Sequence, residues 1–512
     1  MPSCDAIIIG GGTNGLACAA RLAASGRRVT VLEAAPAMGG GASTVEFAPG
    51  YRVSGLAHLV LNLDPRVVQG MDLARHGLGY ATTNLATTAL SATGDHLRLD
   101  GPFGAHAPGL SEADRAAWAA LRSRLLAFAR VLAPFNAMAP PRIARRAGND
   151  TLRLAKLGLG VRALGKEEFR EFLRMILINV ADVLEDDLTD DRLRGALAFD
   201  ATLGAWLGPR SPNSLILLLN RLAGAQGALA VPQGGMGAVA GAMTRAATAA
   251  GVALRCGAKV ARVLVTGDAA SGVMLDTGEE LHAPLVISAI NPRVTFQRLV
   301  GPQHLDAGFF TRTGHIRSRG GAAKLHLALK GLPDFRGADP TTRLVIAPSV
   351  GVVENAFNAV KYAEVPDAPV MEVILPSAHG TGMAPDGCHS LSAIVQFAPH
   401  APENPDAARA QMLEAALRQL EAHAPGLRGL ILHAELLMPY DIAAKFGMEG
   451  GNWHHGELAV EQMLFLRPLP EAAQYATPLP GLWLAGAGSH PGGGISGAAG
   501  WNAADRIIKV LK

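Results

Sequence analysis

The sequence predicts an α/β fold, α+β overall, built around a parallel sheet to which separate segments of the chain contribute. Two observations predict it. An apolar run near the N-terminus leads into a glycine-rich turn and an Ala-rich stretch, and a second apolar run near the C-terminus leads into another Gly-rich turn and helical stretch. The chain has 512 residues, 49% of them hydrophobic, which is enough for two or more domains with ample cores.

The N-terminal strand, turn and helix carry a dinucleotide-binding fingerprint. In the turn, Gly10 permits a tight bend, Gly12 lets the backbone approach a pyrophosphate, and Gly15 allows the helix to pack closely on the strand. Glu33 ends the next strand, where a carboxylate is placed to hold a ribose hydroxyl. The chain is therefore predicted to bind an adenine dinucleotide. The contacts expected from this unit are Gly10, Gly12, Thr13, Asn14, Gly15, Glu33 and Ala34.

A glycine doublet, Gly39-Gly40, continues the loop after Glu33. This continuation resembles that of FAD-binding amine oxidase-like and phytoene desaturase-like flavoproteins. Those families usually place Arg after the doublet, where it contacts the FAD phosphates, but this chain has Gly41. Ser43 or backbone N–H groups are the expected replacements. The resemblance implies FAD contacts at Gly40, Gly41, Ala42 and Ser43.

The C-terminal residues 480–504 read PGLWLAGAGSHPGGGISGAAGWNAA and predict a short strand, a Gly-rich turn and a helix over about 496–511. This segment resembles the C-terminal flavin signature of phytoene desaturase-like oxidoreductases. The resemblance implies flavin contacts at Gly488, His490, Gly494 and Ile495. A helix N-terminus aimed at the flavin favours the negative charge of its reduced form by roughly 0.3 to 2 kcal/mol.

Shorter motifs extend the resemblance to one branch of these flavoproteins, the pyridine nucleotide-disulphide oxidoreductase domain proteins. The motifs lie at 49–58, 231–237, 288–292, 384–387 and 450–457, and the match is weakest from about 100 to 230. The resemblance implies flavin contacts at Ala57 and His58 and an adenine contact through the backbone of Val260.

The expected organisation is discontinuous. Residues 1–80, 230–300 and 470–512 form a Rossmann-type FAD-binding domain, and residues 81–229 and 301–469 form a substrate-binding domain with a mixed sheet and a helical cap, as in amine oxidase and phytoene desaturase-like flavoproteins. Apolar spacing predicts helical faces in the cap at Leu121, Leu125, Leu126 and Ala129, and again at Phe169, Phe172, Leu173 and Ile176. Further elements are expected at 237–250, 252–254, 260–265, 285–288, 324–329 and 371–375.

The predicted activity is an FAD-dependent oxidoreductase in which the flavin takes a hydride from a substrate C–H bond. The resemblance and the apolar cap favour a hydrophobic small-molecule substrate. Candidate catalytic residues are His490, His454, His455 and Glu457. The alternative for residues 454–457 is a purely structural loop that hydrogen bonds stabilise. No metal is expected, because neither HExxH nor a following Pro-Cys-x-x-Cys accompanies the H-x-E spacing.

Three alternatives stay open at this stage. A flavin amine oxidase shares the fold and usually surrounds its amine with aromatic side chains, for which Trp453, Tyr475 and Trp501 are candidates. A saturase or reductase runs the reaction in the opposite direction. A noncatalytic flavin-binding interaction protein is the alternative from another class. A second dinucleotide site at 235–237 is disfavoured, because no strong strand precedes it and Arg255 stands where an acid is expected.

The net charge and the spacing of the cysteines limit the binding partners and the cellular location expected for this protein. A net charge of +3 argues against a nucleic-acid binder, and four scattered cysteines without a CxxC pair fit a reducing, cytoplasmic location. No secretory signal is expected, and the apolar stretches 222–244 and 472–504 are too rich in Gly and Pro for membrane spans. A basic cluster is either a solvated helix face or a surface for anionic lipid headgroups, as in a peripheral membrane contact, or for an acidic substrate. Its residues are Arg142, Arg145, Arg146, Arg153, Lys156 and Arg162. The oligomeric state is not predicted.

Overall fold

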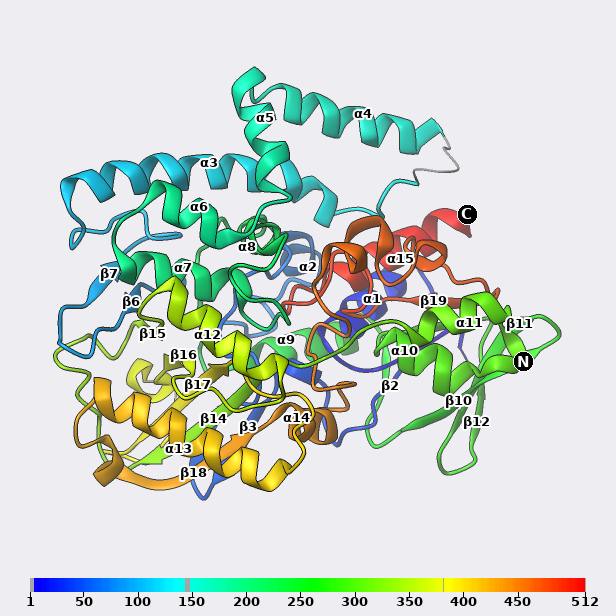
Figure 1. Ribbon diagram of the computed structural model, residues 1–512. Helices are drawn as coiled ribbons and strands as arrows, with labels where there is room; N and C mark the ends of the chain where they lie inside the picture. Colours follow the sequence, from blue (N-terminus) through cyan, green and yellow to red (C-terminus); the bar gives the residue numbers. More distant parts are fainter. Residues whose placement is uncertain (1–3, 143–147, 381, 512) are drawn as a thin grey trace.

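Two sheets organise the protein in a computed structural model that describes residues 4–142, 148–380 and 382–511 (Figure 1). The first sheet is parallel and has the strand order β19-β13-β1-β2-β9. Its strands are β1 (Ala6–Ile9), β2 (Val29–Leu32), β9 (Ala253–Arg255), β13 (Leu285–Ser288) and β19 (Leu482–Leu484). Segments far apart in the sequence therefore build one sheet. The boundaries of the two predicted domains stay a prediction.

Both faces of the parallel sheet are covered, which explains why its central strand is a continuous apolar run instead of an alternating one. Ala6 and Ile8 pack with the helices α1 (Thr13–Ala23), α9 (Met236–Ala249) and α15 (Ala498–Val510). Ile7 and Ile9 pack on the other side with an antiparallel sheet of β10 (Val260–Thr266), β11 (Ala269–Leu275) and β12 (Glu280–His282). The carboxyl ends of β1 and β2 are left for the glycine-rich loops.

The second sheet is mixed and has the order β18-β14-β17-β16-β15-β6-β7. Its neighbours are antiparallel except for the parallel pair β15 and β6. Helix α13 (Pro405–His423) covers one face, where Met412 and Leu420 pack against Leu325 and Leu327. The strands are β6 (Thr87–Ala89), β7 (Leu97–Leu99), β14 (Ala322–Leu329), β15 (Arg343–Ile346), β16 (Val370–Ile374), β17 (His389–Gln396) and β18 (Ile431–Leu437).

A layer of helices lies over the second sheet and beside the first (Figure 1). It contains α3 (Glu112–Asn136), α4 (Gly148–Arg162), α5 (Lys166–Met175), α6 (Val180–Asp187), α7 (Asp191–Thr202), α8 (Ser214–Leu222) and α12 (Val350–Lys361). The first predicted apolar face is confirmed, because Leu121, Leu125, Leu126 and Ala129 of α3 are all buried.

The second predicted face is wrong in part. Phe172 is buried, but Phe169 is 37% exposed and Leu173 is 45% exposed. Helices α4 and α5 project from the body (Figure 1), so those side chains have little to pack against.

Arg142 and Arg153 of the predicted basic cluster are described, whereas Arg145 and Arg146 lie outside the described residues.

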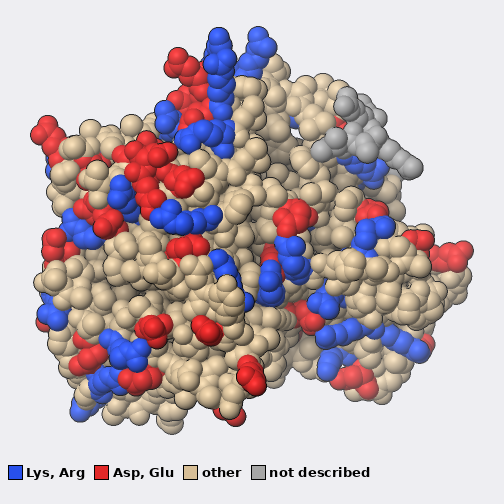
Figure 2. Space-filling model, viewed as in Figure 1, with Lys and Arg blue, Asp and Glu red and all other residues tan. Residues whose placement is uncertain are grey.

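The other α-helices and strands are short. They are α2 (Pro65–Gly70), α10 (Pro292–Val294), α11 (Ala307–Gly314), α14 (Pro439–Phe446), β3 (Thr44–Ala48), β4 (Tyr51–Ser54), β5 (Tyr80–Thr82) and β8 (Val231–Pro232). Within the described ranges, no helix combines the length and the apolar character that crossing a membrane requires. Figure 2 shows cationic and anionic side chains interspersed over one face of the molecule, so that face has no field of one sign.

Candidate functional site

A cavity of about 930 Å³ begins at the carboxyl ends of β1 and β2 and continues to the second sheet. Ile9 and Leu32 line it at the parallel sheet, and Glu372 of β16 and Ile394 of β17 line it at the mixed sheet. Ligands of open α/β sheets bind at the carboxyl ends of the strands, so this is the expected position for a dinucleotide.

The glycine-rich turn leaves room for a phosphate group. A Cβ atom on Gly12 would meet no heavy atom within 4 Å, because that position faces the cavity. Gly12 is also the N-cap of α1 and caps it with no side chain, so the first N–H groups of the helix are available to an anion. A Cβ on Gly15 would instead collide with the carbonyl oxygen of Gly10, which places Gly15 at the packing contact between helix and strand.

Glu33 is fixed at the edge of the same cradle. Its Oε2 accepts a hydrogen bond from the backbone N–H of Gly11 at 2.7 Å, and its Oε1 accepts one from Ala35 at 2.8 Å. A carboxylate has about four acceptor positions, so it can still receive ribose hydroxyl groups. The residues present therefore fit an adenine dinucleotide.

Most of the predicted cofactor contacts line the cavity. They are Gly10, Gly12, Thr13, Asn14, Glu33, Ala34, Gly40, Gly41, Ala57, His58, Val260, Gly494 and Ile495. Gly15, Ala42, Ser43, Gly488 and His490 are not among the described residues that line it. Gly488 has a packing position, since a Cβ there would press on Pro292. The individual contacts stay predictions.

Two Gly-rich loops, 450–457 and 488–495, pack together at the cavity wall. A Cβ on Gly493 would lie 2.5 Å from Nδ1 of His454, whereas a Cβ on Gly494 would meet nothing within 4 Å. His454 and His455 both line the cavity. Burial is the main cause that lowers the pKa of His454 to about 3 and that of His455 to about 4. Nε1 of Trp453 donates to Nε2 of His454 at 3.0 Å, so the neutral ring carries its proton on Nδ1.

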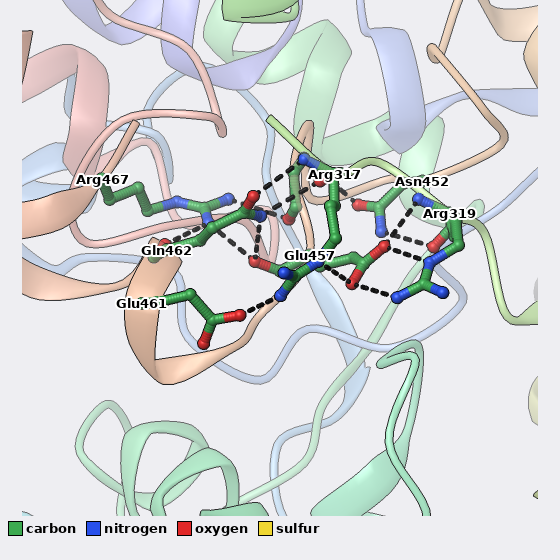
Figure 3. Close-up of polar contacts among 8 residues, drawn as sticks. Arg317, Arg319, Asn452, Glu457, Glu461, Gln462 and Arg467 are labelled. Atoms are coloured by element: carbon green, nitrogen blue, oxygen red, sulfur yellow. Dashed lines mark hydrogen bonds and ion pairs between the residues drawn. The ribbon is translucent and has the colours of Figure 1, made fainter. Parts of the chain in front are cut away.

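Glu457 and His490 have different surroundings from the other two catalytic candidates. Figure 3 shows the Glu457 carboxylate between two guanidinium groups, with Arg319 Nε at 2.7 Å and Arg317 Nε at 3.1 Å. The buried ring of His490 donates from Nε2 to the carbonyl oxygen of Phe135 at 2.7 Å. Neither residue is among the described residues that line the cavity, and their catalytic roles stay predictions.

Arg467 holds the first loop, and the residue immediately before the second loop, through backbone carbonyl groups. Its guanidinium donates to the carbonyl oxygen of His454 at 2.6 Å and to that of Ala487 at 2.8 Å. It also donates to the carbonyl oxygens of Gly456, Glu457 and Gln462. The hydrogen bonds of this side chain therefore set the shape of the wall formed by the two loops.

A buried charge cluster, which sequence reasoning missed, forms another part of the wall. The cluster consists of Asp200, Arg221, Lys324, Arg343 and Glu372, together with His58. His58 joins two of its members, because Nε2 is 3.0 Å from Glu372 Oε1 and Nδ1 is 2.9 Å from Lys324 Nζ. The only sequence signal is a lone charged residue inside an apolar strand, as at Lys324 and Glu372.

Burial and pairing shift the titration of this cluster. Burial lowers the pKa of His58 to about 4, and Lys324 adds to that effect. Burial also lowers the pKa of Lys324 to about 7 against the opposing influence of Glu372. Burial alone would raise the pKa of Glu372, but Arg343 and His58 outweigh it and hold that pKa well below its usual range. His58 is therefore neutral near pH 7, while Glu372 is ionised.

The structure also shows where the candidate aromatic residues and the possible second dinucleotide site at 235–237 lie. Trp453 lines the cavity, whereas the Tyr475 hydroxyl donates to the His490 carbonyl oxygen at 2.8 Å and the Trp501 ring lies 5.4 Å from the Arg21 guanidinium. At 235–237 the N–H groups of the helix start donate to Ser54 and Thr44. Across the described part of the chain, no group of three or more His, Cys, Asp or Glu side chains is placed to hold a metal ion.

Comparison with known proteins places this geometry in a family. Residues 15–508 match the family described as flavin-containing amine oxidoreductase. Pyridine nucleotide-disulfide oxidoreductase domain-containing protein 2 of Rattus norvegicus is 30% identical, and the match covers 100% of this chain and 94% of that protein. Hydroxyneurosporene desaturase of Cereibacter sphaeroides is 28% identical over 99% of this chain and 97% of its own.

The fold is also shared with a solved structure. Cyclohexylamine oxidase from Brevibacterium oxydans has a TM-score of 0.59 at 17% identity, and the superposition covers 100% of each chain. The fold class and the resemblance predicted from the terminal motifs are confirmed. The chain belongs to the flavin-containing amine oxidoreductase family and is an FAD-dependent oxidoreductase.

Proposed function

We propose that this enzyme dehydrogenates a C–H bond of a hydrophobic small molecule. The observation that carries the proposal is the continuity of the cavity, which joins the dinucleotide cradle at Gly12 to a chamber lined in large part by apolar side chains. Bound FAD supplies the hydride acceptor for such a reaction. The likeness to a protein named hydroxyneurosporene desaturase supports the same reaction class.

The chamber suits an apolar substrate because of the side chains that form it. Leu56, Leu59, Leu61, Leu203, Leu229 and Ile394 line it. Burial of about 100 Å² of apolar substrate surface contributes about 2.5 kcal/mol of binding free energy. The same walls exclude water from the reacting bond, which protects the hydride transfer from side reactions.

Neutral imidazoles at the wall provide hydrogen-bonding groups that bind no further proton near pH 7. His454 and His455 are proposed to affect the turnover rate, since both line the cavity and are neutral near pH 7. His58 is fixed between an amine and a carboxylate, so its proposed role is to orient Glu372.

The test is anaerobic bleaching of the flavin by a panel of hydrophobic alkenes, alcohols and amines. We expect reduction by an apolar donor and little reduction by NADH or NADPH. Rapid, saturable bleaching by NADPH with none by organic donors would instead make the protein a reductase or saturase. Bleaching by amines alone would make it an amine oxidase, and either outcome contradicts the proposal.

A further inference from the structure

Arg221 presents a guanidinium to the cavity with few partners. It lies in the last turn of α8, and it lines both the large cavity and a smaller one of about 40 Å³ beside it. Its side chain is only 18% exposed. Among the described residues the guanidinium has one ionic contact, to Asp200 at 3.4 Å, and no hydrogen bond. A guanidinium has five N–H donors, so most of the hydrogen-bonding capacity of this side chain at the cavity wall is unused among the described residues.

The carboxylate nearest to Arg221 is already committed elsewhere. Asp200 accepts two hydrogen bonds from Arg343, at 2.5 and 3.2 Å. Arg343 also donates to Glu372 at 2.6 Å and is fully buried. Of the two arginines in the buried charge cluster, Arg343 is therefore satisfied and Arg221 is not.

The cluster has no surplus of negative charge that could pair with Arg221. Arg221 and Arg343 are matched in number by Asp200 and Glu372. Burial lowers the pKa of Lys324 to about 7, so this amine is only partly protonated near neutral pH. His58 is neutral there. A buried guanidinium with few partners is costly, and an anionic group in the cavity would supply the missing partner of Arg221.

We propose that Arg221 binds a carboxylate of the substrate, so that the substrate is an amphipathic molecule with an apolar body and one anionic end. The apolar body lies among Leu61, Leu203 and Leu229, which line the same cavity as Arg221. A planar carboxylate matches the guanidinium fork and can accept hydrogen bonds from the N–H groups that Arg221 leaves unpaired. The inference rests on the proposed function, since it assigns this chamber to the substrate.

The test uses three probes of equal chain length on the FAD-loaded protein: decanoate, decan-1-ol and decylamine. Calorimetric titration near pH 7 is expected to show decanoate binding about tenfold or more tightly than decan-1-ol, with decylamine the weakest. Arg221→Met should lower the decanoate affinity by about tenfold or more and leave the decan-1-ol affinity within about twofold. Arg221→Lys should retain part of the preference. Arg210→Met, in an exposed arginine paired with Glu185, is the matched control.

Equal affinity of the wild-type protein for decanoate and decan-1-ol would overturn the inference, and this comparison needs no variant to fold. A decanoate preference that survives in Arg221→Met would overturn it as well. Failure of the proposed function has a different signature, namely a protein that holds no FAD or a flavin that no organic donor reduces. A flavin reduced by neutral apolar donors, without carboxylate preference, contradicts only the assignment of Arg221.

Discussion

At the scale of single residues, Gly12 is the position at which one added group should remove the cofactor. Its φ of −70° is accessible to any residue, and a Cβ there has free space. Gly12→Val should therefore fold but place a branched side chain where the pyrophosphate must approach. We expect purified Gly12→Val to lack the flavin absorbance of the wild-type protein.

Gly429→Val is the matched control for that experiment. Gly429 also has free space for a Cβ, but it is exposed and lies outside the cavity lining. It should retain the yellow colour. A fully flavin-loaded Gly12→Val protein would show that the cradle does not hold the pyrophosphate.

Lys324 should make the stability depend on pH. Burial lowers its pKa from 10.5 to about 7, so between these values the unfolded chain binds more protons than the folded one. The free energy of unfolding contributed by this group therefore rises with pH through that window, by up to about 1.4 kcal/mol per pH unit. Lys324→Met should lose this rise. Urea unfolding of both proteins at several pH values measures it, and parallel pH profiles would contradict the assignment.

At the scale of elements, the contact between the two Gly-rich loops gives the next prediction. Gly493→Leu would push against His454, and should disturb the flavin spectrum and redox potential. His454→Ala removes a ring without inserting atoms, so it should change turnover more than the spectrum. Absorption spectra and potentials of the two variants test the difference. An unchanged spectrum in Gly493→Leu with FAD fully retained would place the loop away from the flavin.

Elements with a strong local pattern could be predicted from the sequence, and those that depend on distant pairing could not. The strand Leu285–Ser288 was predicted with its observed bounds, and the helix Met236–Ala249 within one residue at each end. The strands Thr87–Ala89 and Leu97–Leu99 were missed, because three residues carry little periodicity and Thr87 pairs with the distant Arg343. The apolar periodicity at Phe169 and Leu173 predicted a helix face, but it could not predict which element, if any, packs against that face.

The same distinction applies to the site. The cradle around Gly12 and Glu33 is a contiguous motif whose chemistry is readable in order along the chain. The buried charge cluster joins residues between positions 58 and 372, and only the folded molecule brings them together. A lone Lys or Glu in an apolar strand signals a buried charge but does not name its partner.

At the scale of the whole molecule, FAD should stabilise the parallel and the mixed sheet together, because strands of both sheets line the cavity. A ligand that binds only the folded state adds about 2.7 kcal/mol at 100 times its dissociation constant. We expect the flavin-free protein to unfold at a lower temperature, with Tm rising as FAD is added. Riboflavin is the control, because it lacks the adenosine that the N-terminal cradle would hold. A Tm independent of FAD would contradict the expectation.

The hydrogen bonds of Arg467 bear on how this enzyme can evolve. Each acceptor that it uses in the two loops or next to them is a backbone carbonyl, and every amino acid supplies one. Mutations that exchange His454 or His455 therefore leave the scaffold of the wall intact while changing its reactivity. Descendants of a common ancestor can then diverge in substrate at these positions, and an alignment should find the arginine invariant where the histidines vary.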